Sequence, residues 1–339
     1  MHHPRSSVER LYLSRKVGGR GLLNLETLCR NKEQRLRTYF VSHGSLMHQA
    51  TCNQDHDFTS LHLRDENDVH IATKTQAERL QTWREKPLHG RFAAELTAEH
   101  VDLKESTEWL RTAGLFSETE GFLLAIQDQV VRTRNYERHI LKTAVDDRCR
   151  LCKKPGETIQ HITGGCSVLA PKEYLERHNA VAKVVHQALA KQHGLVETET
   201  PYYKCKPEQV MQNHDVKILW DSMIVTDRAV EANRPDLVLI DKKEKTAIII
   251  DIAVPLDNHV VTTCAEKRRK YQPLAVELKH MYRLREVTIV PVVVSVNGLV
   301  NSDWKSARKL LQLKQKHMRI MQKAAILGTA NIVRKVLNL

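Results

Sequence analysis

Two aspartates in "NRPDLVLIDKKEKTAIIIDIAVP" have the type and spacing of residues that could do chemistry. The runs "LVLID" and "TAIIIDIAVP" are rich in β-branched residues and flank the polar segment "KKEK", which predicts a β-hairpin. If residues 242–245 form the turn, Asp241 faces Thr246. The same register places Asp236 opposite Asp251. Opposed residues share a sheet face with Cβ atoms about 4.5–5.5 Å apart, so the two carboxylates are expected to meet.

Two facing carboxylates repel each other and need a compensating charge. A hard divalent cation, Mg²⁺ or Mn²⁺, would supply it and could orient a water for attack on a phosphate. The segment "CAEKRRKYQPL" places Lys267 and Lys270 on one face of an expected helix that Pro273 would kink or end. The competing interpretation is structural: strand-end aspartates commonly cap turns, and basic helix faces are commonly solvated.

A cysteine and histidine cluster, "CRLCKKPGETIQHITGGC", has metal-ligand spacing. Cys149 and Cys152 form a Cys-x2-Cys pair, and His161 and Cys166 would complete a tetrahedral Cys3His shell for Zn²⁺. Four protein ligands leave no position for a reacting water, so this zinc would be structural. Chance clustering around a buried thiol pair is the alternative.

The composition favours a polyanionic partner. The 339 residues include 53 Lys and Arg against 40 Asp and Glu, a formal charge of +13, and such an excess binds phosphates by releasing counterions. No apolar run approaches the roughly 20 residues of a membrane span, and "MHHPRSSVER" has no apolar signal core. We therefore expect an intracellular, soluble protein whose 7 cysteines are reduced.

The elements that must position these residues can be predicted from periodicity. "KVGGRGLLNLE" predicts a turn and "CRNKEQRLRTYF" a helix, while "AIQDQVVRTRNYERHIL" predicts one basic amphipathic helix carrying Arg132 and Arg134. "PKEYLERHNAVAKVVHQALAKQ" predicts a second helix, ended by Gly194. "EVTIVPVVVSV" predicts a strand with Pro291 at an edge or bulge. Beyond Trp304 a basic amphipathic helix is expected.

The stretch "RPDLVLIDKKEKTAIIIDIAVPLDNHV" followed by "EKRRKY" resembles the restriction-like endonuclease of site-specific non-LTR (LINE-type) retrotransposons, a branch of the PD-(D/E)xK nucleases. The order "TRNYERHI", Cys-Cys-His-Cys, "YLERHNAV" and "ILWDSMIVTD" agrees with the C-terminal part of such polyproteins. "GGRGLLNLE" resembles their linker beyond the reverse transcriptase thumb. The resemblance covers most of the chain and is strongest over residues 135–298. No Tyr-x-Asp-Asp polymerase signature is present, so a truncated element lacking the reverse transcriptase domain is expected.

The resemblance implies roles for particular residues. Asp236 and Asp251 match the metal-binding acids. Ala253 stands where many members of the superfamily carry their lysine, and in this branch Lys267 and Lys270 match instead. We prefer Lys267 as the catalytic lysine, with Lys270 as the second candidate.

Other residues of the same motifs are candidates for nucleic-acid contact. Tyr271 would position a phosphate or only pack, and Arg234 would contact DNA or only the local turn. Arg132 and Arg134 are further candidates. Asp221, in the matching Trp-Asp segment, would be an additional acid or, as we prefer, a helix cap.

The implied fold is α/β, a restriction-endonuclease-like mixed sheet flanked by helices and preceded by a mostly helical region and a small zinc knuckle. The expected domains are a helical linker region over 1–125, a basic helix, zinc knuckle and following helix over 126–195, the endonuclease over 205–300 and a basic C-terminal helix over 301–339.

The implied function is Mg²⁺-dependent nicking of a target DNA duplex in the nucleus, leaving a 3′-hydroxyl as primer. The element RNA is a further candidate partner, and no membrane is expected to be involved. A catalytically inactive nucleic-acid-binding remnant is the alternative. A cellular resolvase-like nuclease of the same superfamily is a weaker one, because the zinc knuckle argues against it.

Overall fold

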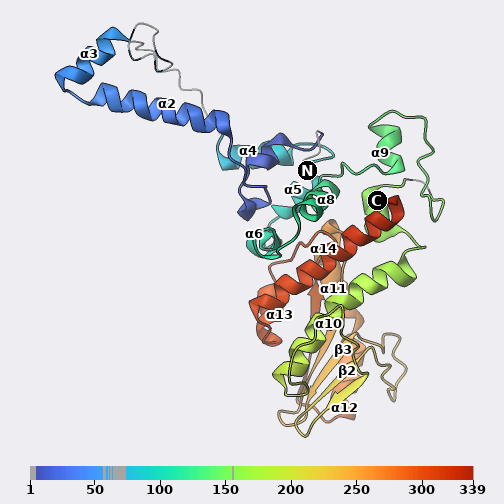
Figure 1. The fold of residues 1–339 in the computed structure, drawn as a ribbon. Helices are drawn as coiled ribbons and strands as arrows, with labels where there is room; N and C mark the ends of the chain where they lie inside the picture. Colours follow the sequence, from blue (N-terminus) through green and yellow to red (C-terminus); the bar gives the residue numbers. More distant parts are fainter. Residues whose placement is uncertain are drawn as a thin grey trace.

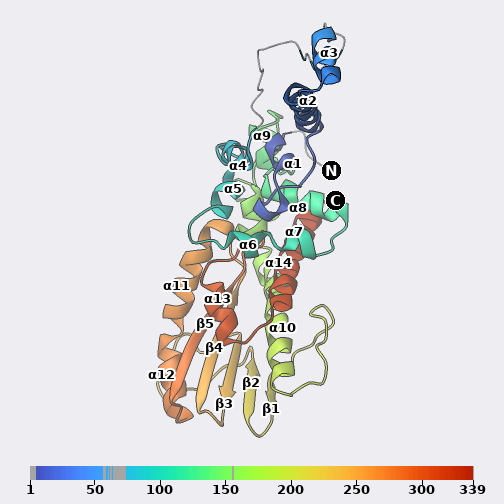
Figure 2. The same ribbon diagram turned by 90° about the vertical axis from the view of Figure 1, so that its left-hand side faces the viewer.

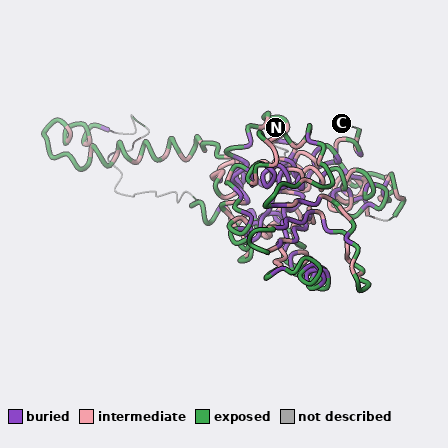
Figure 3. The backbone as a smooth tube through the Cα atoms, turned by 90° about the horizontal axis from the view of Figure 1, so that it is seen from below, coloured by how far each residue is buried: buried purple, intermediate pink, exposed green. Residues whose placement is uncertain are grey.

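The computed structural model describes residues 5–55, 59, 61, 63, 74–154 and 156–338. The protein is a mixed α/β structure in which a five-stranded sheet lies at one end and a mostly helical N-terminal region at the other (Figure 1). Two helices, α2 (Leu25–Ser42) and α3 (Leu46–Gln54), extend away from this body. They contain no buried residue, and Figure 3 shows them as exposed with intermediate stretches.

The sheet has the order β1-β2-β3-β4-β5, with antiparallel pairing up to β4 and parallel pairing of β4 with β5. Its strands are β1 (Val210–Gln212), β2 (Val216–Trp220), β3 (Leu237–Asp241), β4 (Thr246–Ala253) and β5 (Glu286–Val293). Asp241 pairs with Thr246, so the predicted hairpin register is confirmed. Strand β5 lies at the sheet edge, as predicted for the strand containing Pro291.

Helices cover both faces of the sheet (Figure 2). Leu237 and Leu239 pack on the face covered by α10, α13 and α14, whereas Val238 and Ile240 pack on the face covered by α12. The covering helices are α10 (Leu175–Gln192), α11 (Val260–Lys270), α12 (Gln272–Met281), α13 (Trp304–Leu310) and α14 (Gln315–Leu337). Helices α11 and α12 connect the parallel pair β4 and β5. Helix α11 ends at Lys270, just before Pro273, which lies in the first turn of α12.

The predicted single helix over residues 125–141 is wrong. The structure has α8 (Ser117–Gln127) and a separate α9 (Arg134–His139). Gln129 adopts a positive φ of 56°, which ends the first helix. The Thr133 side chain accepts a hydrogen bond from the Tyr136 N–H and so caps the start of the second. Local capping therefore outweighs the helical periodicity of the apolar residues.

The C-terminal basic segment is also divided, into α13 and α14, with Gln312 at a positive φ of 49° in the connection. The expected amphipathic character is confirmed, because the apolar residues of this segment are buried in the core that covers the sheet: Ala307, Leu311, Met318, Met321 and Ala325. The helix ended by Gly194 is confirmed as α10, with Gly194 at a φ of +67°.

The N-terminal region is held together by a buried ion pair. Arg10 lies 2.6 Å from Asp128, and its guanidinium stacks 4.5 Å from the Trp83 ring. Its short elements are α1 (Val8–Tyr12), η1 (Arg15–Val17), α4 (Gln76–Arg84), α5 (Arg91–Leu96), α6 (Leu103–Thr107) and α7 (Trp109–Thr112). The predicted glycine-rich turn follows η1, where Gly18 has a φ of +86°.

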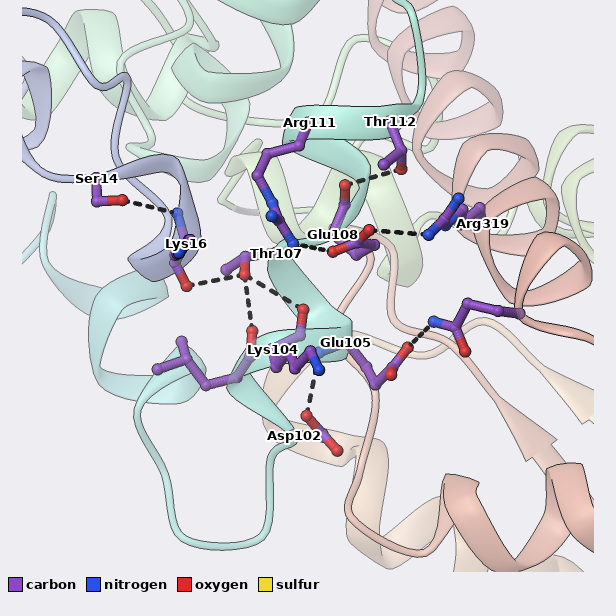
Figure 4. Close-up of polar contacts among 12 residues, drawn as sticks. Ser14, Lys16, Asp102, Lys104, Glu105, Thr107, Glu108, Arg111, Thr112 and Arg319 are labelled. Carbon is purple, nitrogen blue, oxygen red and sulfur yellow. Dashed lines mark hydrogen bonds and ion pairs between the residues drawn. The ribbon is translucent and has the colours of Figure 1, made fainter.

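A polar junction fixes this region against α14 (Figure 4). The Thr107 hydroxyl donates to the Lys16 carbonyl at 3.0 Å, which ties α6 to η1. Glu108 accepts from Arg319 of α14 at 3.1 Å and also pairs with Arg111. The N-terminal helices and the sheet-covering helix α14 are therefore joined by charged contacts as well as by apolar packing.

Candidate active site and metal-binding site

Asp236 and Asp251 lie next to each other at one end of the β3–β4 hairpin. Leu237 pairs with Ile250, so the next residues outward are Asp236 and Asp251. Asp251 is 2% exposed and pairs on its other side with Pro291 of the edge strand. Burial and the nearby charge of Asp236 both raise the pKa of Asp251. The structure thus brings together the two carboxylates that the sequence placed opposite each other.

Lys267 supplies the positive charge closest to this pair. Its Nζ lies 2.5 Å from Oδ2 of Asp251. Helix α11 carries it, following β4 along the sheet face on which Asp251 lies. The Lys267 ammonium opposes the rise in the pKa of Asp251 and also lowers that of Asp236. Asp236, Asp251 and Lys267 therefore form one charged cluster.

Lys270 lies one contact further away. Its Nζ is 3.1 Å from the Tyr271 hydroxyl and 4.7 Å from the centre of that ring. Among the described residues it has no ion pair with Asp236 or Asp251, and its side chain is exposed. Of the two candidate lysines, Lys267 is thus the one whose charge meets the aspartates.

Tyr271 is buried beside the cluster, with 1% of its surface exposed. Burial, and then the charge of Asp251, raise the pKa of its hydroxyl, so at neutral pH it is a neutral donor. The hydroxyl donates to the Arg234 carbonyl at 3.3 Å. Tyr271 therefore fixes the segment that leads into Asp236.

The Arg234 guanidinium points to another acid. It makes two parallel hydrogen bonds to Asp221, Nε to Oδ1 at 2.8 Å and Nη2 to Oδ2 at 2.9 Å. Asp221 directly follows β2 and has a positive φ of 43°. It starts no helix, so its interpretation as a helix cap is wrong. The pair is exposed on both sides, and Arg234 remains accessible to a ligand.

His178 of α10 is a member of the site that sequence reasoning missed. Its Nε2 lies 3.2 Å from Oδ2 of Asp236 and 3.1 Å from the Ile252 carbonyl oxygen. Because a carbonyl can only accept, Nε2 carries the proton. Burial lowers the pKa of His178, but the hydrogen bond and charge of Asp236 raise it above its usual value overall. The residue stands in "YLERHNAV", a motif noted in the sequence without a role for its histidine.

The carboxylate oxygens of the aspartate pair differ in their contacts. Oδ2 of Asp236 accepts from the Ile252 N–H at 2.6 Å and contacts His178, whereas Oδ1 has no hydrogen-bond partner within the described part of the chain. Asp251 is a buried carboxylate balanced by one lysine. Mg²⁺ commonly binds through one or two carboxylates and keeps several waters. Asp236 and Asp251 offer hard oxygen atoms of this kind, and Oδ2 of Asp251 is shielded from solvent and lies beside Lys267.

The cysteine and histidine cluster forms a compact site that could bind zinc. The ligand atoms of Cys149, Cys152, His161 and Cys166 all lie within 4.8 Å of one another. The Cys149 and Cys166 sulfurs are 3.9 Å apart, and the Cys152 sulfur is 3.3 Å from Nε2 of His161. With Zn–S bonds of about 2.3 Å, a tetrahedron places its ligand atoms about 3.8 Å apart. Burial lowers the pKa of His161, which favours the neutral imidazole that metals bind.

Tyr174 and the Arg150–Glu157 pair hold the zinc-type loop, which carries Cys149, Cys152, His161 and Cys166, in place. The Tyr174 hydroxyl accepts from the Cys166 N–H at 3.1 Å and donates toward the Ile162 carbonyl at 2.8 Å. Glu157 is fully buried and pairs with Arg150 at 2.8 Å. Arg150 in turn donates to the Val336 carbonyl at 3.2 Å, near the end of α14. The loop is therefore docked on the same helix that covers the sheet.

Arg132 and Arg134 lie beside this loop rather than at the aspartates. Arg132 is exposed in the connection before α9. Arg134 begins α9 and donates from Nη1 to the Arg148 carbonyl at 3.2 Å. Neither contacts the Asp236–Asp251 pair in the described structure.

No family model matches the chain, and no curated protein matches it. Among the described residues, none of the helices combines the length and apolarity required to cross a bilayer. The family resemblance therefore remains a prediction that rests on the quoted motifs.

Proposed function

We propose that this chain is a Mg²⁺-dependent DNA endonuclease, the target-nicking portion of a non-LTR retrotransposon protein. Mn²⁺ would serve in place of Mg²⁺. The observation that carries the proposal is the contact of Lys267 with Asp251, a buried carboxylate paired in register with Asp236. Buried acids that repel each other beside a lysine are typical of a functional site rather than of a turn cap.

The chain's own side chains divide the work. Asp236 and Asp251 would hold the cation, which when bound orients a water and offsets charge on the phosphate. Lys267, within ion-pair distance of Asp251, would donate a hydrogen bond to the attacking water or the phosphate oxygen beside it. His178 and the Ile252 N–H fix Asp236, so the pair needs little rearrangement to bind.

The basic residues next to the aspartate pair would form the surface that binds DNA. The last turn of α11 contains four consecutive bases from Lys267 to Lys270. Arg268 is exposed and pairs with the exposed Asp303 at 3.1 Å. Exposed ion pairs contribute little and are exchanged readily for backbone phosphates. We therefore place target DNA over this turn of α11, and expect the protein to act on nuclear DNA.

The restriction-endonuclease-like fold and the zinc are part of the same proposal. A five-stranded mixed sheet with helices on both faces is compatible with that fold. We propose that Cys149, Cys152, His161 and Cys166 bind Zn²⁺ with all four positions taken by protein, so that the metal docks the loop and does no chemistry.

The test is nicking of supercoiled plasmid in Mg²⁺ by wild type, Asp251→Ala and Asp227→Ala. Asp227 is an exposed acid of the loop between β2 and β3 and serves as the matched control. We expect nicking by wild type and Asp227→Ala and its loss in Asp251→Ala. Salt-sensitive DNA binding with no metal-dependent nicking by wild type would favour the inactive nucleic-acid-binding remnant instead.

A further inference from the structure

A cavity of about 560 Å³ lies between α10 and α14, away from the aspartate pair. Arg177 and Lys183 of α10 line one side, and Asn331 of α14 lines the other. Tyr203, from the segment after α10, completes the rim. The cavity is thus lined by charged, polar and apolar side chains of two helices and of the segment after α10.

Arg177 is the unusual residue of this cavity, because it is 4% exposed and takes part in none of the ion pairs between described residues. Its Nη1 donates to the Thr329 hydroxyl at 3.1 Å, and its Nε has no partner. Burial lowers its pKa to about 10, so it is still charged at neutral pH. The two other buried arginines that the structure describes have carboxylates: Arg10 pairs with Asp128 and Arg79 with Glu9.

A buried charge without a counterion is costly, and the packing shows why Arg177 does not move out into solvent. A Cβ atom at Gly328 of α14 would lie 2.7 Å from the Arg177 Cγ. The arginine stem therefore occupies the space that this glycine leaves open. Glycine inside a helix costs about 1 kcal/mol relative to alanine, so the sequence keeps a destabilising residue where it makes room for a buried cation.

The neighbouring charges do not neutralise Arg177. Glu173 is paired with Lys335 of α14. Glu176 is exposed at the rim. Lys183 is half-buried and, within the described part of the chain, has no ion-pair partner. The cavity therefore presents two unpaired cations and one exposed acid.

We propose that Arg177 and Lys183 bind a phosphate group in this cavity, and that the phosphate belongs to a nucleic-acid backbone. A phosphate accepts the bidentate hydrogen bonds that a guanidinium offers. Tyr203, whose side chain is 71% exposed, is placed to stack on an adjoining base. The site rests on the nucleic-acid-binding part of the proposed function but not on its catalysis. Because His178 follows Arg177 on α10 and reaches Asp236, one helix would connect the phosphate site to the aspartates.

The experiment measures the duplex DNA affinity of the zinc-loaded full chain as a function of salt, by fluorescence anisotropy without added Mg²⁺ or Mn²⁺. Loss of one phosphate contact lowers the slope of log K against log [salt] by about 0.9 in magnitude. We expect that decrease in Arg177→Gln and not in Lys279→Gln, an exposed lysine of α12 on the opposite sheet face. Arg177→Lys is expected to retain the slope.

A second variant separates binding from folding. Asn331→Asp places a carboxylate at an exposed position of the same cavity. It offers Arg177 a counterion, so thermal stability is expected to be kept or raised while DNA affinity falls. If Arg177 had only a structural role, thermal stability and DNA affinity would not change in opposite directions.

A small-anion arm identifies the source of the phosphate. If inorganic phosphate raises the melting temperature of wild type but not of Arg177→Gln, while the DNA slopes agree, the site takes a free phosphate. The proposal would be overturned if wild type and Arg177→Gln had equal slopes of log K against log [salt] and equal changes in melting temperature with inorganic phosphate. Since no step requires cleavage, loss of nicking in an independent assay would reject the nuclease without affecting this result.

Discussion

The Lys267 ammonium lies 2.5 Å from Oδ2 of Asp251, a carboxylate buried at the end of a central strand. This contact joins the hairpin to helix α11 and gives the aspartate pair its compensating charge. It also ranks the two candidate lysines, because Lys270 instead contacts the Tyr271 hydroxyl.

The ranking of the lysines can be measured. Lys267→Ala removes the charge that contacts Asp251, so we expect nicking to fall by about 100-fold or more, the usual contribution of a positioned acid–base group. Lys270→Ala serves as the matched neighbour and is expected to cost less than about 10-fold, through weaker phosphate contact. Initial nicking rates at saturating Mg²⁺ decide the order. A larger loss in Lys270→Ala would reject the assignment of Lys267.

His178→Ala tests the positioning of Asp236. Removing the imidazole frees Oδ2 of Asp236 from one of its two fixed contacts. Side chains that orient metal ligands usually contribute about 10–100-fold in activity or metal affinity. We expect a rise of that size in the Mg²⁺ concentration needed for half-maximal nicking. His214→Ala, at a fully exposed histidine, should leave it unchanged, and a response equal to the control would exclude a role for His178.

Glu157→Gln tests how the zinc-type loop is held. Burial raises the pKa of Glu157, but the hydrogen bonds and charge of Arg150 together with the Arg134 N–H lower it further, so the net shift is downward. The stabilisation is therefore full above the unfolded pKa near 4.5 and is lost as the pH falls through the folded value. We expect Glu157→Gln to lower the free energy of unfolding by about 3 kcal/mol at pH 7. This difference from wild type should become smaller below about pH 4. Glu208→Gln, at an exposed acid, controls for the change of charge. A stability difference between Glu157→Gln and wild type that does not vary with pH would contradict the account.

Asp257 predicts a pH dependence of the opposite sign. Burial raises its pKa from 3.8 to about 6, while Ser295 and Asn297 partly offset the rise. The folded protein then holds a proton that the unfolded chain has released, so stability falls as the pH rises from about 4 to 6. Asp257→Asn is expected to remove this loss. The free energy of unfolding of the variant, measured relative to wild type, should be up to about 3 kcal/mol larger at pH 8 than at pH 4. Chemical denaturation at the two pH values, with Glu244→Gln as the exposed control, measures it; an equal gain at both would contradict the assignment.

The sequence correctly predicted features that depend on residues close together in the chain, such as a strand register and a helix end. The β3–β4 register follows from strand runs separated by a four-residue turn, and the break at Pro273 follows from proline chemistry. The single helix over residues 125–141 failed because Gln129 and the Thr133 cap divide a run that periodicity alone joins.

Contacts between residues far apart in the chain were beyond such reasoning. His178 meets Asp236 only because α10 packs on the sheet, 58 residues away in sequence. Arg10 and Asp128 are likewise joined across 118 residues. In both pairs, the residues adjacent in sequence give no indication of the contact.

The central claim is that Asp251 serves a metal-dependent hydrolysis of DNA. Its most direct test is the initial rate of plasmid nicking by Asp251→Asn, a substitution that keeps shape and removes charge, relative to wild type at saturating Mg²⁺. A fall of about 100-fold or more with DNA affinity unchanged is the result we predict. A rate equal to that of wild type would contradict it.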